Sequence, residues 1–293
     1  MAFEGGLAAK VAVYFQHPFS CLKTERVFMP IQTDHTTVRI EVTDGASIPE
    51  PGESRFINAW SISLMGALGL LAFMSVRYPD VCWELLVVLP EGILVTFQVT
   101  VLSILCAVPI GCVVALARLS NNKPLKLLAS TYVEVIRGIP LLVQLFFIFY
   151  SLSYYLNVPS FVAAIAGLSF CYGAYLSEVF RAGINAVQKG QTEAARSLGF
   201  SKWQTMRYII LPQAMRTILP PVGNECIAML KDTSLISIVG LTDMFRVTRE
   251  TVAVSYEYFK LYTVIALVYL VITLILSKCV SVMETRLSYY DKK

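Results

Sequence analysis

The chain has 293 residues, of which 56% are hydrophobic and only 15% are charged, and its mean hydropathy is +0.64. An average soluble domain is about 25% charged, so this chain has too little polar surface to cover a soluble globule. Disorder is excluded over most of the length, because disordered segments are poor in apolar residues and rich in charge. The composition instead suits a membrane protein of five to seven helices with short loops.

The net charge of +4 is unevenly distributed along the chain. Residues 1–56 hold five Lys or Arg against seven Asp or Glu, and the remainder holds nineteen against thirteen. The basic excess therefore lies among the hydrophobic segments, which indicates orientation in a membrane and not a nucleic acid partner.

The seven cysteines and two histidines predict neither a disulfide framework nor a metal site. The cysteine count is odd, no CxxC occurs, and five cysteines lie in apolar stretches where cysteine acts as a small hydrophobe. His17 and His35 lie in the polar N-terminal part without ligand-like neighbours. The first residues also lack the basic start and long apolar core of a signal peptide.

Runs without charge locate the membrane spans. The first three are Ile57–Val76, Gly92–Ala117 and Gly138–Ser177. As one helix the third run would be about 60 Å long, twice the thickness of a bilayer core, so it must form two spans. We expect the break at residues 157–160, because they include Asn and Pro, which interrupt helices.

Two further segments complete the expected set of spans. Leu261–Ser277 is free of charge and extends past Lys278, whose long stem can snorkel. Thr217–Leu241 is long enough to cross but is interrupted by polar groups. It contains three ionisable residues: Glu225, Lys231 and Asp232. The predicted fold is all-α, a polytopic membrane helical bundle of about six transmembrane helices with both termini on one side.

The charges of the connecting segments select that side. Arg118–Glu134 has three basic residues against one acid, and Arg181–Arg216 has six against one. Residues 284–293 add three more basic residues. All three segments fall on one face of the predicted bundle, which should be cytoplasmic. Both termini are therefore predicted to be cytoplasmic, and residues 1–56 form an N-terminal extension to which we assign no function.

The loop between the fourth and fifth spans has helix start and stop signals. Thr192 is the expected N-cap, and Glu193 in the first turn suits the helix dipole. Gly199 fits a left-handed stop, and Ser201 with Gln204 forms a capping box for a second helix. A short helix with an alanine-lined face can dock in a groove of another protein. Because the loop is basic, a helix lying on lipid headgroups is the alternative.

The loop contains Glu193-Ala194-Ala195, then Gly199 after three residues, Ile209 after nine more, and Leu211-Pro212. In these residues and their spacing it resembles the EAA loop of ABC importer permeases. Other segments resemble the polar amino acid branch of the same family: residues 132–145, 174–181, 211–216 and 220–235. The similarity covers about 88–283, with the EAA loop at 190–212. Residues 57–78 are then an additional transmembrane helix, and residues 284–293 are a cytoplasmic tail.

The resemblance implies a set of partners in a bacterial inner membrane. It implies a second permease subunit, identical or homologous, a cytoplasmic ATPase dimer, and an external binding protein that delivers a polar amino acid. The EAA helix would be the coupling helix that docks in the ATPase. The implied docking residues are Thr192, Glu193, Ala194, Ala195, Arg196, Leu198 and Gly199. No G-x-x-x-x-G-K-[ST] occurs, so we expect no cofactor and no enzymatic activity in this chain, with ATP and Mg bound by the partner.

The polar span supplies candidates for the substrate pathway. An ionised side chain at mid-bilayer costs ~2.5–3.5 kcal/mol, so these groups must face protein, water or headgroups. A broken helix there would also present backbone groups to a substrate. The candidates are Asn224, Glu225, Lys231, Asp232, Thr233 and Ser234. Asn224 and Glu225 are preferred, because Lys231 and Asp232 are also explained by a structural pair near an interface.

Two charge pairs with i,i+3 spacing have a structural explanation. Glu178 and Arg181, at the end of the fourth span, are expected to form a helix-end ion pair. Glu134 and Arg137, at the start of the third, are structural or form a hinge with the neighbouring Gly138 and Pro140.

Three functions remain open on the residues alone. The first is the permease subunit of an ATP-driven amino acid importer. The second is an ion-coupled secondary carrier in which Glu225 or Asp232 binds the ion, which leaves the pattern at 193–212 unexplained. The third is a membrane scaffold without transport, for which intramembrane charges have no purpose.

Overall fold

The computed structural model describes residues 58–156 and 158–288, and within these ranges the chain is helical without strands. The first five helices are α1 (Ala59–Arg77), α2 (Pro79–Leu119), α3 (Lys123–Gly138), α4 (Leu141–Leu156) and α5 (Ser160–Ala186). They are followed by α6 (Lys189–Ser197), α7 (Lys202–Gln204), the π-helix η1 (Thr205–Ile210), α8 (Leu211–Asp232), the 3-10 helix η2 (Thr233–Val239), α9 (Met244–Ser255) and α10 (Tyr258–Ser288). The all-α prediction is confirmed, while the predicted extension 1–56 lies outside the described residues.

Within the described ranges, α1, α2, α5 and α10 are long and apolar enough to cross a membrane. Helix α3 together with Leu141–Ser151 of α4 makes a fifth candidate that is bent by 106°. The predicted sixth span is less regular than expected. Helix α8 does not meet the same criterion, since it carries two internal prolines and several polar residues and ends at Asp232.

The predicted boundaries hold at some positions and move at others. The break at residues 157–160 is confirmed, because α4 ends at Leu156 and α5 begins at Ser160. Helix α2 has 41 residues and is much longer than the predicted run Gly92–Ala117. Its charged N-terminal turns extend it beyond the apolar run. Helix α10 continues to Ser288, so the predicted tail 284–293 begins as helix.

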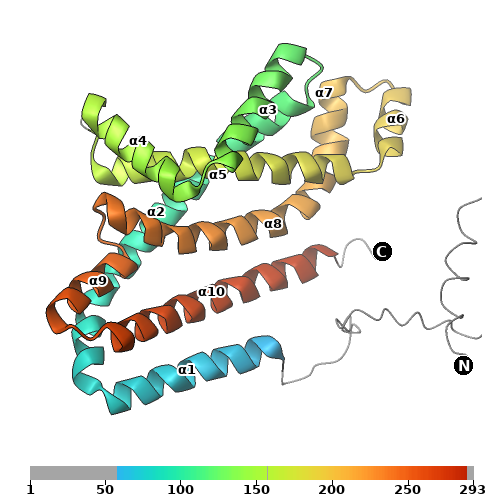
Figure 1. Ribbon diagram of the computed structural model, residues 1–293. Coiled ribbons are helices and arrows are strands. Elements are labelled where there is room, and N and C mark those ends of the chain that lie inside the picture. The colour runs from blue at the N-terminus through green and yellow to red at the C-terminus, as the bar shows by residue number, and fades with distance from the viewer. Residues whose placement is uncertain (1–57, 157, 289–293) are drawn as a thin grey trace, which may run out of the picture. The chain divides into compact units, whose positions relative to one another are not determined.

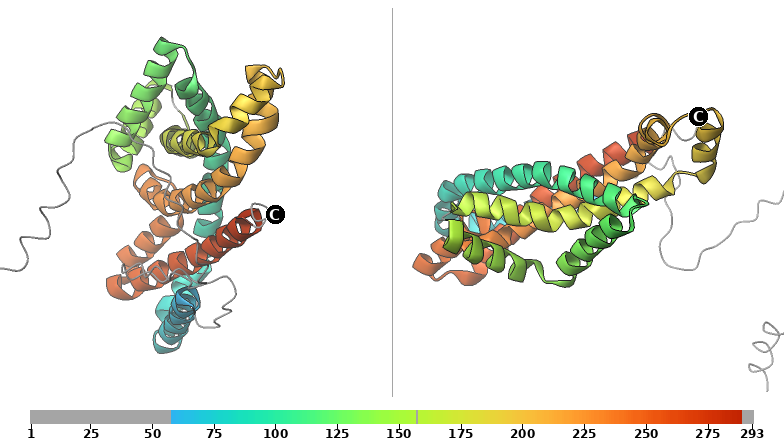
Figure 2. Two further views of the ribbon diagram at one scale, coloured as in Figure 1. Left: turned by 90° about the vertical axis from the view of Figure 1, so that its right-hand side faces the viewer. Right: turned by 90° about the horizontal axis from the view of Figure 1, so that it is seen from above.

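Helices α1, α10, α8 and α5 lie side by side in that order, and α2 crosses and contacts all four (Figure 1). The C-terminal ends of α2 and α5 lie at one end with α6 and α7 (Figure 2). The α1–α2 turn, α9 and the start of α10 lie at the other end. The chain therefore has two distinct ends, and the predicted coupling loop projects from one of them.

Helix α2 packs closely on α5 because each helix places a glycine against a side chain of the other helix at the crossing. A Cβ at Gly111 would lie 2.7 Å from Leu176 Cβ, and one at Gly173 would lie 2.5 Å from Ile110 Cγ2. Small residues allow this approach between membrane helices, where packing and not hydrophobicity drives association. A buried core joins α5 to α8 through Leu176 and Ile218. Helices α2, α5 and α8 thus form the frame that positions the polar groups.

The additional helix α1 packs on α10 and α2. The Trp60 indole Nε1 donates to the Leu274 carbonyl oxygen at 2.8 Å, and the Lys278 ammonium lies 5.4 Å from the Trp60 ring centroid. Met74 is buried in a cluster with residues of α2, α9 and α10. Helix α1 is thereby placed at the side of the bundle away from α5 and α6.

Candidate functional site

The predicted coupling helix is present as α6, but it begins earlier than expected. Its N-cap is Gln188, whose backbone is extended and whose side chain makes no capping hydrogen bond. Thr192 therefore lies inside the helix and is not its cap, and Glu193 lies beyond the first turn. Gly190, a poor helix former, falls within the helix. Because glycine disfavours a helix, Gly190 indicates a loop before Thr192 when the sequence is considered alone.

The end of α6 and the start of α7 agree with the predicted signals. Gly199 has φ +85°, and the Phe200 amide donates to the Ala195 carbonyl oxygen at 3.1 Å, as in a left-handed helix stop. The Ser201 amide donates to Gln204 Oε1 at 2.8 Å, and the Gln204 amide donates to Ser201 Oγ at 3.2 Å. The capping box is therefore confirmed.

Helices α7, η1 and α8 form one continuous helical segment, called the rod below, whose course turns between α7 and α8 (Figure 1). Every residue at their junctions has right-handed helical angles, so the backbone never leaves the helix between Lys202 and Asp232. The π-helix η1 ends two residues before Pro212, which lacks an N–H and displaces the carbonyl four residues earlier. The rod joins the tip at Gly199 directly to Glu225 and Asp232 in the bundle.

The faces of α6 divide the predicted docking residues. Ala195 is only 4% exposed, because α6 packs on η1 through this side. Ala195 is therefore covered by its own chain, contrary to the prediction that it forms part of the docking surface. The other predicted docking residues are exposed: Thr192, Glu193, Ala194, Arg196, Leu198 and Gly199. Leu198 is 79% exposed. Trp203, which follows shortly after it in the chain, is also exposed, and the prediction omitted it.

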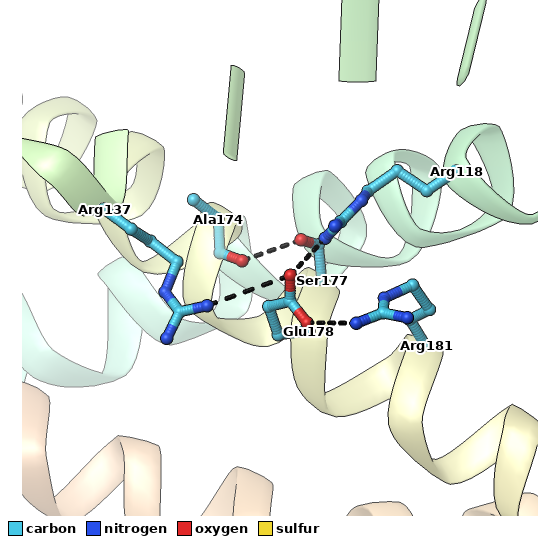
Figure 3. A network of polar contacts seen from close by, with 6 residues as sticks. All are labelled: Arg118, Arg137, Ala174, Ser177, Glu178 and Arg181. Atoms are coloured by element: carbon cyan, nitrogen blue, oxygen red, sulfur yellow. Dashed lines mark hydrogen bonds and ion pairs between the residues drawn. The ribbon is translucent and has the colours of Figure 1, made fainter. Parts of the chain in front are cut away.

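A cluster of charged side chains, called the Glu178 centre below, lies around Glu178 (Figure 3). Its carboxylate accepts from Arg118 Nη1 at 2.5 Å and from Arg181 Nη2 at 2.7 Å, and Arg137 Nη1 lies 3.8 Å away. The predicted pair of Glu178 with Arg181 is confirmed. Arg118 and Arg137 come from α2 and α3, and their part here was missed because they are distant in sequence.

This centre ties three helices together on one carboxylate. The Arg118 side chain is 11% exposed and that of Glu178 is 24% exposed, so water screens the contact only in part. Arg137 also lies over the Tyr175 ring, with its guanidinium carbon 5.6 Å from the ring centroid. Its described contacts are thus with α5, while Glu134, its predicted partner, is exposed. The bend at Gly138 and Pro140 follows directly after Arg137.

The last two residues of α8, Lys231 and Asp232, have different surroundings. The Tyr172 hydroxyl of α5 donates to Asp232 Oδ2 at 2.7 Å, so Asp232 is held against the bundle core. Lys231 instead lines an open cavity of about 570 Å³ with Ser234 and Tyr269. The suggested ion pair of Lys231 with Asp232 is not found among the described residues, where Asp232 is instead bonded to Tyr172.

The remaining pathway candidates differ in exposure. Asn224 is exposed and Glu225 is half-buried on α8. Thr233 is fully buried, and its hydroxyl donates to the Leu230 carbonyl oxygen at 2.7 Å. The Ser234 hydroxyl donates to the Lys231 carbonyl oxygen at 2.8 Å. Thr233 therefore supports the change from α to 3-10 helix and does not face the cavity.

Asp243 anchors the segment that follows η2. Its carboxylate accepts from the Phe245 and Arg246 amides at 3.0 and 3.1 Å, which caps α9. The Met244 amide donates to Thr96 Oγ1 of α2 at 3.2 Å. Burial raises the pKa of Asp243 to about 6, although the amide hydrogen bonds oppose that shift. An Asp at a helix start was the available signal for this residue, which the prediction did not include.

Residues 107–289, more than half of the chain, match the family of the binding-protein-dependent transport system inner membrane component. The chain belongs to this family. It is thus a membrane subunit of a transport system and a multi-pass inner membrane protein.

Curated relatives cover most of the chain. The glutamine transport system permease protein GlnP of Escherichia coli (strain K12) is 35% identical over 70% of this chain and 95% of its own length. The L-cystine transport system permease protein TcyB of Bacillus subtilis (strain 168) is 39% identical over 70% and 89%. The arginine permease protein ArtQ of the same organism is 35% identical over 69% and 93%.

Solved structures agree with this assignment. A chain of an amino acid ABC transporter crystallised with histidines is 43% identical, with a TM-score of 0.65 over 72% of this chain and 96% of that one. A chain of the MetNI methionine ABC transporter, at 20% identity, has a TM-score of 0.56 over 69% and 96%. The second similarity concerns the fold alone.

Proposed function

We propose that this permease imports a polar amino acid across the inner membrane with the energy of ATP hydrolysed by a separate subunit. The substrates in the relatives' names, glutamine, arginine and cystine, support this class of cargo. Each carries a carboxylate and an ammonium, and the end of α8 with the start of η2 offers a cation, carboxylates and a hydroxyl. The ion-coupled carrier and the scaffold receive no support from these relatives.

The observation that carries the proposal is the exposed tip of α6 at the start of a continuous rod. Glu193, Ala194, Leu198 and Gly199 dock in a groove of the ATPase, with Thr192 and Arg196 beside them. ATP and Mg bind to the ATPase and not to this chain. When the ATPase dimer closes, its groove moves α6, and the rod α7–η1–α8 transmits the movement to Glu225 and Asp232.

The cargo pathway runs beside the polar end of α8. Lys231 and Ser234 line the cavity next to α9 and α10, and Asn224 and Glu225 lie two turns away on the same helix. A carboxylate of the cargo fits the Lys231 ammonium. An ammonium of the cargo fits Glu225.

The partners occupy opposite ends of the molecule. The ATPase dimer binds the basic end that carries α6, which places both termini in the cytoplasm. The external binding protein docks at the end that carries α9. A second permease subunit, identical or homologous, completes the pathway. Lipid surrounds the exposed apolar faces of α1 and α10.

The test is reconstitution of the chain with its ATPase, partner permease and binding protein in proteoliposomes. We expect uptake of a polar amino acid that requires both ATP and the binding protein, and a competition panel of basic, acidic and amide amino acids identifies the cargo. Uptake driven by an ion gradient without ATP would support the secondary carrier and contradict the proposal. Membrane binding of α6 without ATPase binding would support the lipid-surface alternative.

A further inference from the structure

The bend between α3 and α4 leaves backbone carbonyl groups without hydrogen-bond partners in a helix. Helix α3 ends at Gly138 and α4 begins at Leu141, with an angle of 106° between them. Pro140 has no N–H and cannot continue the hydrogen bonds of α3. The last carbonyls of α3 therefore lack helical partners, and a buried carbonyl such as that of Ile136 needs one from elsewhere in the chain.

The side chain of Gln144 satisfies two carbonyls at the bend, one in the last turn of α3 and one just after its end. Its amide nitrogen donates to the carbonyl oxygens of Ile136 and Ile139, each at 2.6 Å. Its amide oxygen accepts from the Cys171 thiol of α5 at 2.8 Å. Carbonyl oxygens only accept, so they orient the amide nitrogen toward the bend and leave its oxygen for the thiol. Gln144 is only 5% exposed and links α3, α4 and α5.

Further contacts with the bend come from side chains on the same face of α5. Cys171, Tyr175 and Glu178 are four and three residues apart, so they share one face of the helix. Cys171 contacts Gln144, whereas the Tyr175 ring and the Glu178 carboxylate contact Arg137. The hydrogen bonds of Gln144 thus hold the backbone on both sides of Arg137.

We infer that Gln144 is a positioning residue for transport and acts through Arg137. It keeps Arg137 against Glu178, so the bent pair α3–α4 moves with α5 as one body. Helix α5 ends at Ala186, directly before the coupling helix begins at Lys189. A loose bend would let α5 move without α3 and α4, and the movement of the ATPase would be lost. This inference rests on the ATP-driven transport proposed above.

The first variant is Gln144→Met, which keeps the side-chain length but removes both donors and the acceptor. In the reconstituted complex we expect the maximal uptake rate to fall about tenfold, because the three hydrogen bonds of the Gln144 side chain are lost. The half-saturating concentration of binding protein should not change, and ATP hydrolysis should continue, so more ATP is consumed per molecule transported. The matched control is Gln98→Met, since Gln98 is exposed on α2 and should retain the normal rate.

A double-mutant cycle separates positioning from a general loss of stability. If Gln144 acts through Arg137, Gln144→Met should lower uptake less than about twofold further in an Arg137→Met background. A full tenfold additional loss in that background would overturn the inference.

The thiol provides an independent test if Gln144→Met does not accumulate in the membrane. Cys171→Ser keeps a donor for Gln144 and should transport normally, whereas Cys171→Ala should lose uptake at unchanged ATP hydrolysis. Equal uptake by these two variants would contradict the inference. A wild-type complex without ATP-dependent uptake would refute the proposed function itself. An active wild-type complex in which Gln144→Met equals Gln98→Met would refute only the role of Gln144.

Discussion

The rod α7–η1–α8, with α6 at its tip, and the centre around Glu178 are built in opposite ways. The rod is made of consecutive residues, and its tip is exposed at the end of the molecule. The Glu178 centre brings together residues of α2, α3 and α5, and its carboxylate and Arg118 are partly buried. The difference indicates separate tasks. The rod offers a surface that a partner can move, and the centre keeps the helices around it together.

The sharpest test of this difference is Glu178→Gln. The change removes the carboxylate and leaves the partly buried Arg118 and Arg181 without their ion pairs, so we expect a loss of about 2–4 kcal/mol in stability. Thermal unfolding of the purified complex measures it. The control is Glu250→Gln, whose partner Arg246 lies 2.7 Å away in an exposed pair. That change should cost less than about 0.5 kcal/mol, and equal losses would contradict the assigned difference.

The next prediction concerns the turn between α6 and α7. Gly199→Ala places a side chain at φ +85°, which costs about 1–2 kcal/mol and tilts the tip. We expect uptake to fall about tenfold while ATP hydrolysis and membrane abundance persist.

Gly190→Ala is the matched control for the turn. Gly190 lies inside α6, has open space around it and has no positive φ. Alanine favours a helix at this position, so uptake should stay normal. If both alanine variants transport equally well, the geometry of the turn does not matter for coupling.

The smallest expected effect concerns the contact between the rod and α5. Tyr172→Phe removes the hydrogen bond to Asp232, which should lower stability by about 1 kcal/mol. Tyr154→Phe, at an exposed residue of α4, should have no effect on thermal unfolding. A loss above that of Glu178→Gln would mean that the Tyr172 contact, and not the Glu178 centre, holds the bundle together.

Features set by neighbouring residues could be predicted from the sequence. The break at residues 157–160, the stop at Gly199 and the capping box of Ser201 each depend on a few adjacent residues. The start of α6 was placed too late, because Gly190 and Thr192 give competing local signals. The packing of Ala195 on η1 depends on how the chain turns back after Gly199, which helix signals do not specify.

Contacts between distant helices left no local signal. Arg118 and Glu178 are 60 residues apart, and Gln144 and Cys171 are 27 apart. A glutamine in an apolar helix indicates that some polar group needs a partner, but the partner depends on the 106° bend. The bend in turn depends on packing against α5. Charge counting could locate the basic end of the chain, but it could not identify which arginines meet Glu178.

The most direct test of the central claim uses two adjacent alanines of α6. Ala194 is exposed and Ala195 is 4% exposed, so Ala194→Cys and Ala195→Cys carry the same thiol on an exposed and a covered face of one helix. In the assembled complex each is labelled with a maleimide photo-crosslinker, and the joined peptides are identified by mass spectrometry. The account predicts crosslinks from Ala194→Cys to the ATPase and few from Ala195→Cys. Crosslinks to lipid alone, or equal crosslinking from both positions, would contradict it.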